Sequence, residues 1–112
     1  YAAEAIALRT AEALDGAYIS HFQNNAAADQ QTNDRAELES SQGQVVISEL
    51  VLNLTTELFN ALGASASTTE KQLDRFWRNV RTQTLHDPID YKYQEIGEWV
   101  LTGKVPDPSF YS

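Results

Sequence analysis

Cysteine is absent from the 112 residues of this chain, and its absence excludes several kinds of chemistry. No disulfide, zinc–thiolate site or thiol nucleophile can form without that side chain. A chain without cysteine is compatible with the reducing cytoplasm, which is the localisation that we expect. The two histidines, His21 and His86, lie too far apart in the sequence to indicate a metal site, so we expect none.

Methionine is also missing, and the chain begins at Tyr1 within what already reads as a helix. Because a complete gene product normally begins with methionine, we expect residues 1–112 to be one domain of a longer protein. The length agrees with a single domain that builds an apolar core without disulfides.

Positive charge is scarce, with 8 lysine and arginine residues against 16 acidic ones and a formal net charge of −8. Such an acidic chain is poorly suited to bind nucleic acid or an anionic membrane surface. No uninterrupted apolar run approaches the roughly 18 residues that a membrane span needs. We therefore expect neither a nucleic-acid partner nor a membrane partner.

The alternating pattern of β-strands is absent, and apolar residues recur instead at helical spacing in four segments. The stripes are Ala7, Ala11, Leu14, Tyr18 and Phe22; Val46, Leu50, Leu54, Leu58 and Leu62; Leu73, Phe76, Trp77 and Val80; and Ile89, Tyr93, Ile96 and Val100. The second segment is apolar around most of its circumference, which indicates a central, buried helix. Four amphipathic helices with short connections predict an all-α, antiparallel four-helix bundle.

The boundaries of the second helix are indicated by polar residues and glycines. The polar segment 24–33 reads as a loop, after which Asn33 or Asp34 caps the helix. Gly63 follows the last apolar residue and suits a C-terminal cap. Gly43 lies inside the helix, where it either kinks the helix or allows another helix to approach closely.

The third and fourth helices also carry capping signals. Ser67 and Glu70 have the spacing of a capping box, which predicts the start of the third helix. Asp87 is expected to cap the fourth helix, with Pro88 at its first position. Gly103 is expected to end that helix.

A basic stripe follows the third segment, where Lys71, Arg75, Arg78 and Arg81 recur at spacings of three and four. One interpretation is an anion site, such as a site for a flavin phosphate, because guanidinium groups pair well with phosphate. The other is a solvated face, or ion pairs with acidic neighbours. Spacing alone favours the second interpretation.

His86 lies at the corner between the third and fourth segments. An imidazole at such an element end can donate or accept a proton near neutral pH. Alternatively, it hydrogen-bonds the local backbone and stabilises the turn. Without further context, the residues favour the structural role.

Residues 73–103 resemble the flavin-dependent monooxygenases of the acyl-CoA dehydrogenase superfamily, the group that contains dibenzothiophene monooxygenase. The residues that carry the resemblance are Arg75-Phe76-Trp77-Arg78-Asn79, Arg81-Thr82 and Leu85-His86-Asp87-Pro88. The likeness extends more loosely over the whole chain. It implies a single C-terminal helical domain at 1–112, with the parent enzyme's N-terminal helical and β domains absent and the isolated chain inactive.

The sequence departs from true acyl-CoA dehydrogenases at three motifs of that family. Asn60, Gly63 and Ala64 stand at its Gln-x-x-Gly-Gly motif, and Arg78-Asn79 stands at its Arg-Asp pair. His86-Asp87-Pro88 occupies the place of its Glu-Gly-Thr motif. The departure favours a monooxygenase, while a dehydrogenase or oxidase with Asp87 as base and a non-enzymatic helical assembly domain stay open as alternatives.

The resemblance implies a site and its partners. His86 becomes the candidate catalytic residue, and Arg78, Asn79 and Gly63 become candidates for flavin contacts. The implied cofactor is reduced FMN, with FAD as the alternative, delivered by a separate flavin reductase. The implied substrate is a small molecule oxidised at sulfur, another heteroatom or an aromatic carbon, and the implied assembly is a homo-oligomer, either a dimer or a tetramer.

Overall fold

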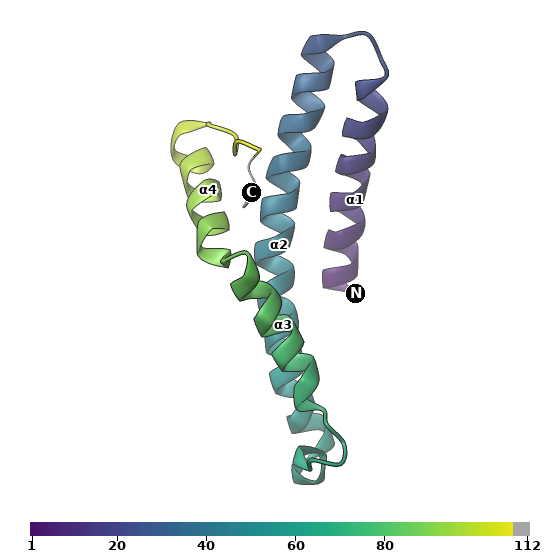
Figure 1. Ribbon diagram of the computed structural model, residues 1–112, viewed down its shortest axis with the longest axis vertical. Coiled ribbons are helices and arrows are strands. Elements are labelled where there is room, and N and C mark those ends of the chain that lie inside the picture. Colours follow the sequence, from purple (N-terminus) through teal and green to yellow (C-terminus); the bar gives the residue numbers. More distant parts are fainter. Residues whose placement is uncertain (109–112) are drawn as a thin grey trace.

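The structure is a computed structural model that describes residues 1–108, and within them it contains helices and no strand (Figure 1). The elements are α1 (Ala2–His21), α2 (Ala26–Leu62), the short 3₁₀ helix η1 (Ala64–Ser67), α3 (Asp74–His86) and α4 (Ile89–Thr102). The predicted all-α architecture with four helices is confirmed. Helix α2 is the shared partner, since α1, η1, α3 and α4 all pack against it.

The helices form an elongated array of 58 × 27 × 21 Å. Helix α1 runs antiparallel along the N-terminal part of α2, and α3 runs back along the C-terminal part (Figure 1). Helix α4 continues in the direction of α3 after a corner at residues 87–88. The two ends of α3 therefore lie at different positions along the length of α2.

Helices α1 and α2 meet through small residues. Ala13 and Ala17 of α1 and Ala36 of α2 are buried. A Cβ atom added to Gly43 would lie 2.6 Å from the Thr10 hydroxyl oxygen, so no larger residue fits without a shift. The prediction that Gly43 permits the close approach of another helix is confirmed.

The predicted core stripe of α1 is wrong. Leu14, Tyr18 and Phe22 are half or more exposed, at 50%, 69% and 68%, while the neighbouring face with Ala13 and Ala17 is buried. Small side chains form this contact because they let the backbones of α1 and α2 come close together. The large apolar side chains of α1 are left facing outward.

Helix α2 is central, as predicted, but the expectation that it is buried is wrong. Of its long apolar row, Val46, Leu50, Leu54 and Leu62 are 41%, 37%, 65% and 48% exposed. Three helices cannot cover the whole circumference of a helix of 37 residues. Much of this apolar surface therefore lies open on the chain taken alone.

One 18-residue window of α2 has a mean hydropathy of 1.4 and at most two charged residues. By length and composition alone it is apolar enough to cross a membrane, which the search for an uninterrupted run missed. The core helix of a soluble protein passes the same test. This window thus adds only weak support for a membrane span.

Helix α2 begins earlier than predicted. It starts at Ala26, and the side chain of Asn25 accepts a hydrogen bond from the Ala28 amide at 3.2 Å. The expected loop over 24–33 is therefore wrong, because a capped run of alanines favours helix even where polar residues follow. At the other end Gly63, with φ +76°, caps the helix by donating its amide to the Phe59 carbonyl at 2.8 Å, as predicted.

The prediction of a capping box at Ser67 is also wrong. Ser67 ends η1, and its hydroxyl donates to the Ala64 carbonyl at 2.7 Å. Helix α3 begins only at Asp74, after a turn in which Gln72 adopts φ +50°. The serine hydroxyl bonds to a backbone carbonyl that precedes it in the chain, and it does not cap an amide at the start of α3.

The start of α4 differs from the prediction in the role of Asp87. Pro88 is the cap residue rather than the first helical one, and no side chain caps the helix. Asp87 instead ends α3 and directs its carboxylate toward Lys92. Gly103 ends α4 as predicted, with φ +76° and its amide bonded to the Trp99 carbonyl at 2.7 Å.

Candidate functional site

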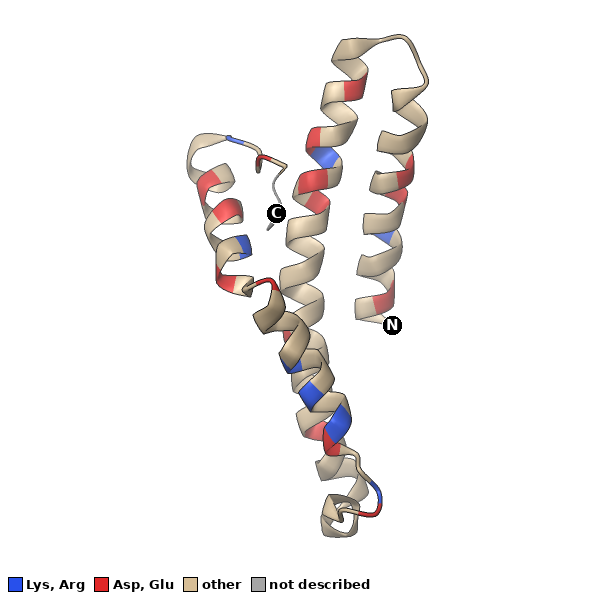
Figure 2. Ribbon diagram, viewed as in Figure 1, with Lys and Arg blue, Asp and Glu red and all other residues tan. Residues whose placement is uncertain are grey.

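Helix α3 carries the basic stripe that its sequence predicts. Arg75, Arg78 and Arg81 lie along the helix and are exposed, and Figure 2 shows these basic positions in a row along α3. Lys71 belongs to the preceding turn and not to the helix, because α3 begins at Asp74. Three guanidinium groups thus share one exposed helix in an acidic chain.

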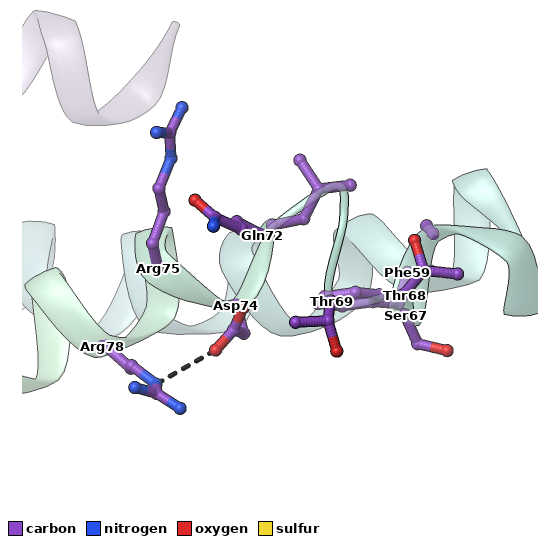
Figure 3. A pocket seen from close by; sticks show the side chains of 10 residues that line it. Phe59, Ser67, Thr68, Thr69, Gln72, Asp74, Arg75 and Arg78 are labelled. Atoms are coloured by element: carbon purple, nitrogen blue, oxygen red, sulfur yellow. Dashed lines mark ion pairs between the residues drawn. The ribbon is translucent and has the colours of Figure 1, made fainter.

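A pocket of about 520 Å³ lies between η1 and the start of α3. Its lining comes from three pieces of chain, as Figure 3 shows: Phe59 of α2, the segment Ala66, Ser67, Thr68 and Thr69, and Gln72, Leu73, Asp74, Arg75 and Arg78. Hydroxyl, amide and guanidinium groups supply most of the polar lining. This donor set fits an anionic group such as a phosphate.

The two arginines of the pocket are held differently. Arg78 forms an ion pair with Asp74, with Nε 3.0 Å from the carboxylate oxygen and both side chains largely exposed. Arg75 lies over the ring of Phe76, with its guanidinium carbon 5.0 Å from the ring centre, and extends away from Arg78 in Figure 3. Exposed pairs of this kind are weak, so both guanidinium groups stay available to a ligand.

Gly63 and Asn79 lie beside this pocket without lining it. Gly63 precedes η1, and its left-handed backbone begins the segment that forms one wall. Asn79 follows Arg78 on α3 and is exposed, and its side chain makes no hydrogen bond within residues 1–108.

His86 lies at the other end of α3. It is the last residue of the helix and is exposed, and among the described residues its imidazole has no hydrogen-bond partner. It lies eight positions after Arg78, about 12 Å along the helix axis. The chain by itself therefore places Arg78 at the pocket near η1 and His86 at the opposite end of α3.

A smaller hollow of about 250 Å³ lies near the corner that follows His86. Residues of α2, α3 and α4 line it, among them Val45, Arg81, Thr84 and Tyr93. Thr84 is buried, and its hydroxyl donates to the Arg81 carbonyl at 2.8 Å. The hollow is open and adjoins the corner through Thr84 and Ile89, while His86 does not line it.

Sequence reasoning missed Lys92, whose side chain is only 2% exposed. Its ammonium lies 3.5 Å from a carboxylate oxygen of Glu95 and 3.9 Å from one of Asp87. The same Glu95 oxygen accepts a hydrogen bond from the Ser41 hydroxyl of α2 at 3.1 Å. The sequence did contain a signal: Lys92 lies three positions after Ile89 and four before Ile96, on the apolar stripe of α4, where a charged residue is unexpected.

Comparison with known proteins decides the family. Residues 1–91 match the family described as "Acyl-CoA dehydrogenase, C-terminal domain". The chain belongs to this family. The match covers most of the chain and includes the basic helix and the corner with His86. Together with the relatives below, it confirms the resemblance noted in residues 73–103.

Individual relatives in this family are monooxygenases. The chain is 43% identical over 104 residues to the probable FMNH2-dependent monooxygenase SfnC of Pseudomonas putida, covering 93% of this chain and 25% of that protein. Its structure is similar to methanesulfinate monooxygenase MsuC from Pseudomonas fluorescens, with a TM-score of 0.86 and 35% identity over 99% of this chain and 28% of that one.

A second solved structure is that of FMN-bound TdsC from Paenibacillus sp. A11-2. Its TM-score is 0.68, with 32% identity over 98% of this chain and 30% of that one. TdsC is a dibenzothiophene monooxygenase. The chain thus spans about a quarter to a third of the relatives that it matches.

Proposed function

We propose that the protein to which this chain belongs is a monooxygenase that uses reduced flavin to oxidise a small sulfur compound, or another heteroatom or aromatic substrate. The observation that carries the proposal is the 43% identity to an FMNH2-dependent monooxygenase across 93% of this chain. Residues 1–112 would form its C-terminal helical domain, beside an N-terminal helical domain and a β domain. The chain alone would then be unable to turn over substrate.

The proposed cofactor is FMN, which the related TdsC binds, with FAD as the alternative. Reduced flavin supplies the chemistry that activates dioxygen. In this chain the guanidinium of Arg78 and the pocket hydroxyls would bind a phosphate group, and the exposed amide of Asn79 would donate to the same cofactor. Gly63 precedes the η1 segment of the pocket wall and adds no side chain at that turn.

His86 is the proposed catalytic residue. Its imidazole is exposed at the end of α3 and has no partner within the described part of the chain. An imidazole in that state is free to donate or accept a proton at a reacting group. The substrate and the flavin ring would lie at this corner once the other domains complete the pocket.

An acyl-CoA dehydrogenase or oxidase is the alternative function, with Asp87 as the base. The position of Asp87 speaks against it, since its carboxylate faces the buried ammonium of Lys92 at 3.9 Å. The exposed apolar side chains of α1 and α2 support assembly with other protein surfaces, which fits both enzymes and also a non-enzymatic assembly domain.

The proposal includes the partners and the location of the intact protein. A separate flavin reductase would supply reduced FMN, and the exposed apolar faces would be covered in a homo-oligomer, either a dimer or a tetramer. The protein would be soluble and cytoplasmic, in keeping with a chain that has no cysteine.

The test is an assay of the intact protein with two sets of substrates. With FMN, a flavin reductase and dioxygen, we expect oxygenated product from a sulfur compound such as methanesulfinate or dibenzothiophene. With an acyl-CoA and an electron acceptor, we expect no turnover. Turnover of the acyl-CoA that is abolished by Asp87→Ala would overturn the proposal, and self-association without any flavin-dependent reaction would favour the assembly domain.

A further inference from the structure

We propose that Lys92 is a positioning residue that holds Asp87 and thereby fixes the corner that carries His86. The role of His86 in this inference rests on the monooxygenase function proposed above. The structural part, that the Lys92–Asp87 pair fixes the corner, stands on contacts within this chain.

Lys92 is, with Ser41, one of the two largest fully buried side chains in the part of the chain that the structure describes. An ammonium group removed from water is costly unless anionic groups surround it. Two carboxylates do so here, from Glu95 at 3.5 Å and Asp87 at 3.9 Å. Both carboxylates therefore offset part of the cost of burying the ammonium.

Glu95 fixes one side of this cluster to the central helix. It lies on α4, three residues after Lys92, and its carboxylate accepts the hydrogen bond of Ser41 from α2. Ser41 is itself fully buried. The ammonium of Lys92 thus has a partner on α4 that is itself bonded to α2, and both contacts lie outside the corner.

Asp87 connects this anchored ammonium to the corner. Asp87 and Pro88 lie between α3 and α4 with non-helical backbones, at ψ 97° and 121°. The Pro88 carbonyl accepts a hydrogen bond from the Tyr91 amide at 3.0 Å, which ties Pro88 to the first turn of α4. The second carboxylate oxygen of Asp87 is buried and has no hydrogen-bond partner among the described residues. Lys92 is consequently the charged group that faces the Asp87 carboxylate, whose side chain is 24% exposed.

His86 precedes Asp87 directly, and its own side chain has no partner in residues 1–108. Its location is therefore set by the backbone of the corner, which Asp87 ties to Lys92. A small displacement of a catalytic group reduces the rate strongly, by about 100-fold for roughly 1 Å. Lys92 would act on the reaction through this geometry without touching the substrate.

The test uses the intact protein with Lys92→Met, Asp87→Asn and the control Glu98→Gln. Glu98→Gln makes the same kind of change on α4, but it removes only an exposed ion pair with Lys104. Hydrogen–deuterium exchange of residues 85–91 reports on the corner, and kcat/KM for oxygenation is measured with and without His86→Ala.

We expect Lys92→Met and Asp87→Asn to speed exchange at the corner, while Glu98→Gln leaves it unchanged. We expect both variants to lower kcat/KM by about 10- to 100-fold when His86 is present, and by no further factor in His86→Ala. If Lys92→Met does not fold, Asp87→Asn decides, because it keeps the pairing of Lys92 with Glu95.

Two results would overturn the inference. One is unchanged exchange at residues 85–91 in the variants. The other is an equal loss of kcat/KM with and without His86, which would mark Lys92 as a purely structural residue. A wild-type protein without any oxygenation would refute the proposed function instead, and the exchange data would still decide whether the Lys92–Asp87 pair fixes the corner.

Discussion

The guanidinium of Arg9 on α1 donates hydrogen bonds to both carboxylate oxygens of Glu39 on α2, at 2.8 and 2.7 Å. These bonds, together with the charge of Arg9, lower the pKa of Glu39 although partial burial opposes the shift. The two-pronged contact joins the helices near the point where Gly43 lets them approach. It therefore belongs to the close packing of α1 on α2 and makes this packing sensitive to acid.

The stability of the intact protein should depend on pH through Glu39. A carboxyl group with a lowered pKa in the folded state stabilises the fold above its unfolded pKa, and this contribution is lost as the pH falls through the folded pKa. We expect Glu39→Gln to reduce stability near neutral pH by a small amount and to match the wild type at low pH. Urea unfolding over a pH series measures this, and Glu37→Gln is the control because Glu37 forms no ion pair within residues 1–108. Parallel curves for wild type and Glu39→Gln at every pH would contradict the prediction.

Replacement of Gly43 and of Gly16 by alanine should distinguish the effect of the tight helix contact on stability from the effect of helix propensity. A methyl group at Gly43 would meet the Thr10 hydroxyl at 2.6 Å, so we expect Gly43→Ala to destabilise the fold by about 1–3 kcal/mol. Gly16 lies in α1 with nothing within 4 Å of an added Cβ, so Gly16→Ala should stabilise by about 0.5–1 kcal/mol. Thermal unfolding measures both, and equal effects of the two changes would show that the contact is not tight.

Arg78 should contribute to the binding of FMN by the intact protein. Loss of a hydrogen-bonded guanidinium from a phosphate group should raise the FMN dissociation constant about tenfold or more in Arg78→Ala. Arg81→Ala removes the same charge from the same helix but lies outside the pocket near η1, so it should have a smaller effect. Quenching of FMN fluorescence gives both constants. Equal weakening by the two variants would mean that only the general charge of α3 matters.

His86→Ala should lower oxygenation without lowering stability. General acid–base groups contribute about 10²- to 10⁴-fold to a rate, whereas an exposed side chain without a partner contributes little to the fold. His21→Ala is the matched control, since His21 is the other histidine of the chain and lies exposed at the end of α1. Oxygenation and the unfolding temperature are measured on the same samples. A fall in the unfolding temperature with His86→Ala would support a structural role for this residue instead.

The exposed apolar row of α2 should be covered in the intact protein. Leu54 is 65% exposed on the chain alone, where a polar replacement would change stability by less than about 0.5 kcal/mol. If other protein surface covers it, Leu54→Asp should cost about 2 kcal/mol or more. Asn53→Asp is the control at the neighbouring exposed position. Light scattering of the same samples shows whether the covering surface belongs to another subunit, because only then does the mass fall.

The four helices and the glycine ends of α2 and α4 follow from local sequence signals. Gly63 and Gly103 were predicted as caps because a left-handed residue closes a helix at little cost only when it is glycine. The prediction of a loop over 24–33 is wrong because it rested on the polar composition of this segment. Asn25 instead caps a run of alanines that begins α2. Local signals of this kind act within one turn and need no distant partner.

The candidate site was predicted in part. The spacing of Arg75, Arg78 and Arg81 placed them on one helix, which the structure bears out. Asp87, by contrast, was assigned to a local cap, while its partner Lys92 was not singled out at all. Spacing shows which residues share a helix face, but it does not show that a lysine in an apolar stripe is buried between two carboxylates.

The sequence by itself determined the number and type of helices, the glycine ends and the relationship to the acyl-CoA dehydrogenase C-terminal family. Only the tertiary structure decided which face of each helix is buried. On α1 the alanines are buried and Leu14 and Tyr18 are exposed, because burial depends on how closely α2 can approach. Gly43 permits that close approach. The link between Ser41 and Glu95 spans 54 residues of chain, so it exists only once α4 has packed on α2.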